Sequence, residues 1–64
     1  MDHQILDHIG KKLKEREAEL IRVVSDGGCK SFDHYKELCG FIRGLQTAQF
    51  EIGDLVRKIK VNDD

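Results

Sequence analysis

The sequence predicts an all-α protein, an antiparallel two-helix hairpin, from two apolar stripes and the glycine turn that separates them. In each stripe apolar residues recur every three or four positions, which places them on one face of a helix. The first stripe consists of Leu6, Ile9, Leu13, Leu20 and Val23, and the second of Tyr35, Leu38, Ile42, Leu45, Ile52, Val56 and Ile59. The periodicity stops over residues 26–31. We therefore expect the two stripes to face each other across a short turn.

The first helix is predicted over about residues 2–25, with Asp2 as its N-cap. In heptad notation the leucines of its stripe occupy position a, and position d holds Ile9, Arg16 and Val23. Arg16 is then the one break in the apolar seam, and we expect its stem to pack while its guanidinium reaches water.

The turn is predicted over residues 26–31, because Gly27 and Gly28 follow Asp26 and glycine readily adopts the left-handed conformation that ends a helix. Ser31 offers an N-cap oxygen for a second helix over about residues 32–60, followed by a frayed tail at 61–64. The alternative is one continuous helix. Two interior glycines would cost that helix about 2 kcal/mol and leave both stripes uncovered.

The second helix has more apolar surface than one partner helix can cover. Phe41, Ala48 and Leu55 share position g beside the seam, and Phe50 lies at position b. A chain of 64 residues buries only about 60% of its unfolded surface, so association is a natural source of stability. We predict that hairpins pair into a four-helix bundle. A larger helical homo-oligomer or burial against a different protein are the alternatives.

Small residues form a ridge on the second helix, at Gly40, Gly44, Thr47 and Ala48. An interior glycine costs a helix about 0.8–1 kcal/mol relative to alanine, which close packing against another backbone can offset. The alternative is that both glycines are tolerated on a solvated face. The predicted interaction residues are Gly40, Phe41, Gly44, Ala48, Phe50 and Leu55.

Gln49 is a polar residue at position a of the second stripe. Polar residues at such positions can fix the register or the oligomeric state of helices. The alternative is that Gln49 lies near an open end of the seam and reaches water.

Neither catalysis nor a bound metal or cofactor is predicted. A nucleophilic cysteine needs a base and an oxyanion pocket, for which a two-helix hairpin has no concave space. Cys29, His34 and Cys39 are spaced by five residues, which scatters them around a helix, whereas zinc ligands come in tighter pairs. We expect two reduced thiols in a cytosolic protein.

Charge and hydropathy narrow the choice of partners. Eleven Lys and Arg against twelve Asp and Glu give a net charge of −1, which disfavours nucleic-acid binding. The N-terminal residues lack the basic stretch and apolar core of a secretory signal. The chain has no apolar run of about eighteen residues, so no membrane span is predicted.

The second helix resembles small uncharacterised proteins of tailed phages, which share a Tyr-x3-Cys-Gly-x-Ile/Leu-x-Gly-Leu pattern followed by an amphipathic helix. The resemblance covers mainly residues 32–55, and the matching positions are Tyr35, Cys39, Gly40, Gly44 and Leu45. It implies a phage origin and an accessory or virion-associated role, in the host cytoplasm or in the virion.

The expected function is therefore that of a non-catalytic interaction or assembly protein, a homo-oligomer with a possible phage or host protein partner. Two alternatives remain. One is an adaptor or inhibitor that docks on a host protein. The other is a small RNA-binding four-helix-bundle regulator, for which Lys11, Lys12, Lys14 and Arg22 would supply the positive charge.

Overall fold

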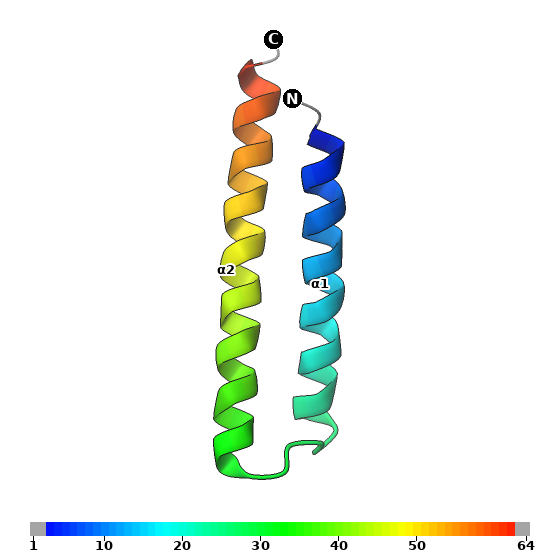
Figure 1. Ribbon diagram of the computed structural model, residues 1–64, viewed down its shortest axis with the longest axis vertical. Coiled ribbons are helices and arrows are strands. Elements are labelled where there is room, and N and C mark those ends of the chain that lie inside the picture. Colours follow the sequence, from blue (N-terminus) through cyan, green and yellow to red (C-terminus); the bar gives the residue numbers. More distant parts are fainter. Residues whose placement is uncertain (1–2, 63–64) are drawn as a thin grey trace.

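The computed structural model is an antiparallel hairpin of two long helices, α1 (His3–Ser25) and α2 (Phe32–Asn62), joined by one turn (Figure 1). It describes residues 3–62, with side chains up to residue 60. The fold predicted from the sequence is confirmed at this level. The predicted N-cap Asp2 and the last two residues lie outside the described part. Helix α2 continues to Asn62, two residues past its predicted end, with Lys60 in a last turn that favours cations.

The turn begins with a Schellman arrangement around Gly27, whose φ is 74°. The Gly28 amide donates to the Val23 carbonyl at 2.8 Å, and the Gly27 amide donates to the Val24 carbonyl at 3.4 Å. A methyl group on Gly28 would lie 3.0 Å from Val23 Cγ1 and 3.1 Å from its carbonyl oxygen. Both glycines are therefore used, one for its backbone angle and one for its lack of a side chain.

Ser31 caps α2, as predicted. Its Oγ accepts a hydrogen bond from the His34 amide at 3.0 Å, and its carbonyl accepts the Tyr35 amide at 3.0 Å. The His34 side chain also reaches back, because its Nδ1 accepts the Lys30 amide at 3.0 Å. Three hydrogen bonds thus fix the point at which the chain re-enters a helix.

The face that α1 turns toward α2 differs in part from the predicted one. The leucines of the stripe are half-buried, as expected, but the residues that alternate with them in the seam are Gly10, Glu17 and Val24. The predicted d residues Ile9, Arg16 and Val23 are exposed. A leucine row at seven-residue spacing can pack with the row on either side of it. The observed choice places Gly10 opposite the Ile52 side chain and spares the Arg16 guanidinium from desolvation.

The seam of α2 follows the prediction more closely. Leu38 and Val56 are its most buried residues, with 9% and 8% of their surface exposed. The remaining seam residues are half-buried, namely Ile42, Leu45, Gln49, Ile52 and Ile59. Tyr35 is the exception, because 42% of its surface is exposed. The core is therefore a single narrow seam along the length of the hairpin.

Replacing Gly27 by alanine should lower the free energy of unfolding by about 1–2 kcal/mol, because a side chain is disfavoured at a φ of 74°. Gly53→Ala is the matched control. A methyl group there meets no heavy atom within 4 Å beyond its own helical turns, so it should raise the free energy of unfolding by about 0.8–1 kcal/mol. Urea denaturation at one protein concentration measures both. Equal stabilisation by the two substitutions would contradict the role given to Gly27.

Candidate functional site

A cluster of three polar side chains interrupts the apolar seam at mid-length. The Glu17 carboxylate of α1 accepts two hydrogen bonds from α2, one on each oxygen. Gln46 Nε2 donates to Oε2 at 2.8 Å, and Gln49 Nε2 donates to Oε1 at 2.8 Å. Gln49 Nε2 also donates to the Leu45 carbonyl at 3.1 Å. Glu17 is thus held by both amides at once.

This cluster fixes the register of the two helices, because sliding α1 by one turn would break both bonds to Glu17. The hydrogen bond from Gln49, then that from Gln46, lowers the pKa of Glu17, and the charge of Lys14 adds to the effect. Gln49 therefore has a partner across the seam, one of the two roles considered for it. Glu17 is not among the interaction residues predicted from the sequence. Its place opposite two glutamines becomes apparent once the helices are aligned in antiparallel register.

The stability supplied by Glu17 should decrease in acid. The pKa of Glu17 in the folded chain lies below its ordinary value of 4.5, so the carboxylate stabilises the fold above about that pH and loses this contribution as the pH falls through the folded-state pKa. The difference in unfolding free energy between the wild type and Glu17→Gln should therefore shrink as the pH falls. Denaturation midpoints measured from neutral to acidic pH test this. Glu15→Gln, on the exposed side of α1, is the control, and a pH-independent difference for Glu17→Gln would contradict the assignment.

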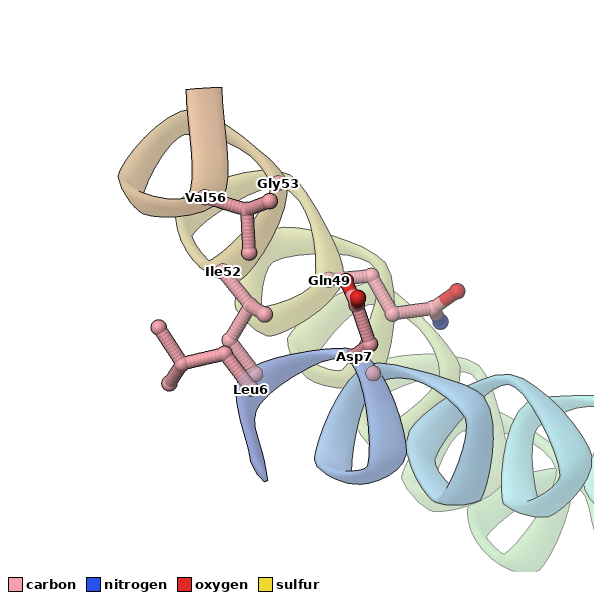
Figure 2. A pocket seen from close by; sticks show the side chains of 7 residues that line it. Leu6, Asp7, Gln49, Ile52, Gly53 and Val56 are labelled. Carbon is pink, nitrogen blue, oxygen red and sulfur yellow. The ribbon is translucent and has the colours of Figure 1, made fainter. Parts of the chain in front are cut away.

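A shallow hollow of about 230 Å³ lies between the helices near the start of α1. Figure 2 shows Leu6 and Asp7 of α1 on one side of it, and Gln49, Ile52 and Val56 of α2 on the other. It lies where Gly10 and Gly53 provide no side chains, and a methyl group on Gly10 would come within 3.7 Å of Ile52 Cγ2. Its volume is below the range of about 300–1,000 Å³ typical of small-molecule sites, and we assign it no ligand.

A second candidate site is an apolar surface along one side of the hairpin, exposed at five residues and half-buried at Ala48. On α1 it comprises Ile5, Ile9 and Val23, and on α2 Phe41, Ala48 and Leu55. We call these six residues the apolar face. Phe41 is 57% exposed, Leu55 45% and Ile5 64%, although all three are large apolar residues.

The two rows of the apolar face lie on the same side because the helices are antiparallel. Successive residues of a helix are rotated by about 100° about its axis, which places each row roughly 60–110° from the seam of its own helix. The rotation from seam to row has the same sense along the chain in both helices. Because the two chains run in opposite directions, both rows then lie on the same side of the hairpin. The contact of Gly10 with Ile52 and the bonds between Glu17 and its glutamines fix the relative heights. Ile9 is level with Leu55, and Val23 with Phe41.

The predicted interaction residues divide between two sides of α2. Gly44 lies in the same row as Phe41, Ala48 and Leu55, and Gly40 lies further outward. Phe50, which is 68% exposed, is about 160° around the helix from Ala48. A methyl group on Gly40 or Gly44 would meet no heavy atom within 4 Å beyond its own helical turns. Within the hairpin, therefore, no second backbone packs against the small-residue ridge.

Phe32 and Tyr35 lie at the start of α2, between the two cysteines of the chain. The Phe32 and Tyr35 rings stack with centroids 6.2 Å apart, and Lys36 Nζ lies 5.6 Å from the Phe32 centroid. The neighbouring thiol of Cys39, one turn along α2, raises the pKa of Tyr35. Cys29 and Cys39 are both free thiols. In the described part of the chain, no three His, Cys, Asp or Glu side chains gather as around a metal ion.

Comparisons of the chain with protein-family models, with curated proteins and with solved structures found no match. Neither helix, over its described residues, is long and apolar enough to cross a membrane.

Proposed function

We propose that the protein is a non-catalytic assembly protein that acts as a homo-oligomer of hairpins, through the surface its helices form together. The observation that carries the proposal is the mismatch between buried and exposed apolar residues. Leu38 and Val56 form the buried core of the described chain, whereas nine large apolar residues are exposed. So thin a core leaves a marginal fold, and covering the apolar face would add the missing burial.

The setting we propose is a tailed phage, with an accessory role in the host cytoplasm or as part of the virion. The support is the resemblance of residues 32–55 to small phage proteins. In the hairpin, the pattern residue Leu45 lies in the seam, Tyr35 and Cys39 lie one turn apart on α2, and Gly40 and Gly44 lie outward. The pattern thus combines residues that build the hairpin with residues on its outer side, where we propose that a partner packs.

Thermal unfolding should depend on protein concentration, because association stabilises a folded state by a free energy that grows with the logarithm of the partner's concentration. We expect the midpoint to rise over about a hundredfold range of concentration, with light scattering giving a mass above 7.4 kDa. A monomer with a constant midpoint would contradict the proposal. If that monomer were stabilised by an added host protein, the adaptor alternative would be favoured instead.

A further inference from the structure

We infer that a second copy of this chain covers the apolar face, with the turns of both copies at the same end of a four-helix bundle. In this arrangement α1 of each copy packs against α2 of the other, and all neighbouring helices are antiparallel. The inference rests on the self-association proposed above and adds its surface and its orientation.

Besides its seam within the hairpin, each helix has a second row of positions that is suited to packing against another helix. On α1 this row runs through Ile5, Ile9, Arg16 and Val23, and on α2 through Phe41, Gly44, Ala48 and Leu55. Successive members are three, four or seven residues apart, which keeps each row on one helix face. Each helix therefore has two seams, one used within the hairpin and one exposed.

A two-fold axis parallel to the helices places the α1 row of one copy on the α2 row of the other at unchanged height. Ile9 then meets Leu55 of the second copy, and Val23 meets Phe41. Arg16, the one long polar side chain in the row, meets Ala48 beside Gly44. The small residues leave space for its stem, while its guanidinium, now 3.0 Å from Glu19, stays at the edge.

The opposite orientation, with the turns at opposite ends, pairs like rows with like rows. Near full overlap it brings Arg16 against Arg16 of the second copy, with Lys12 close by. It would also place Ala48 against Ala48, where neither side chain fills the space. Like charges within an apolar contact disfavour this arrangement.

The surface area agrees with burial against a second copy, and the charges favour the first orientation. The accessible surface is 5146 Å², against about 4,200 Å² expected for a compact monomer of this mass. The excess is similar to the roughly 800 Å² that each partner buries in a standard interface. At the outer edge, Lys12 comes level with Glu51 of the second copy, which pairs opposite charges across the contact.

Cross-linking of single-cysteine variants tests the orientation. In a Cys29→Ser/Cys39→Ser background, Ile9→Cys and Leu55→Cys are mixed and oxidised mildly. We expect the mixed disulfide to form about tenfold faster than either homodimer, because a disulfide needs Cα atoms within about 7 Å. Val23→Cys mixed with Phe41→Cys is the second pair, should the first weaken assembly. Ala48→Cys alone is the control, and its homodimer should form slowly.

Rapid Ala48→Cys homodimers, rapid disulfides between Ile9→Cys and Val23→Cys, or equally slow reaction of all pairs would each overturn the inference. Light scattering on the unoxidised background protein distinguishes a failure of self-association from a failure of the proposed arrangement. A monomeric mass would overturn the self-association and this inference together. A dimeric mass with the wrong cross-links would overturn only the arrangement, and a mass above that of a dimer would exclude a bundle of two copies.

Discussion

Leu45→Asp should unfold the protein. Leu45 is half-buried in the middle of the seam, next to Gln46 and close to the Glu17 carboxylate that Gln46 holds. The substitution removes apolar contacts worth about 2–5 kcal/mol for a well-packed leucine and places a second carboxylate near Glu17. A domain of this length has a total stability of only about 3–10 kcal/mol. Far-UV circular dichroism should therefore show the loss of most helical signal.

Thr47→Asp is the matched control, because it adds the same charge two residues away on the exposed side of α2. Its helicity should stay close to that of the wild type. A folded Leu45→Asp protein of normal mass would show that the seam does not carry the stability assigned to it.

The double substitution Gly40→Ala/Gly44→Ala should weaken assembly while favouring the isolated hairpin. Within the hairpin both positions are open, so each alanine should stabilise α2 by about 0.8–1 kcal/mol. If α1 of a second copy packs against the row that contains Gly44, the methyl group added at Gly44 meets close-packed atoms, and overpacking typically costs about 1–3 kcal/mol. Light scattering over a dilution series measures dissociation, and urea denaturation of the dissociated chain measures the helix gain.

Gly53→Ala is again the control, because it brings the same gain in helix propensity on the other side of α2. A double variant that is more stable and keeps its oligomeric mass across the dilution series would contradict a contact at the ridge. The hairpin itself does not depend on that outcome, since its seam and turn involve neither glycine.

The sequence predicted the two helices and their turn because each depends on local chemistry. Gly27 ends α1 through a backbone angle that glycine prefers, and Ser31 begins α2 through its own hydroxyl. The seam of α2 was also recoverable, apart from Tyr35, because its apolar residues outnumber those of any other face. These features can be predicted without knowing which residues of the other helix they face.

The seam of α1 was predicted only in part, because the leucine row alone does not decide which neighbouring row turns inward. Counting apolar residues favours Ile9 and Val23, but the fold uses Gly10 and Glu17. That choice depends on contacts across the hairpin, namely the approach at Gly10 and the glutamines that bind Glu17. Phe41, Ala48 and Leu55 lie on one side of α2 because they share a heptad position, whereas Phe50 lies about 160° around the helix from Ala48.

The glycine turn also bears on how fast the chain folds. The interhelix contacts nearest the turn close the shortest loop of intervening residues. Each contact further along the helices closes a slightly longer loop. The entropic cost of loop closure grows only logarithmically, by about 0.6 kcal/mol per doubling of loop length. Contacts can therefore form one after another from the turn toward the open end. Helical proteins dominated by local contacts fold in microseconds to milliseconds. We therefore expect the first contacts between the helices to form beside the six-residue turn, and those of the Glu17 cluster to form when about half of the seam is paired.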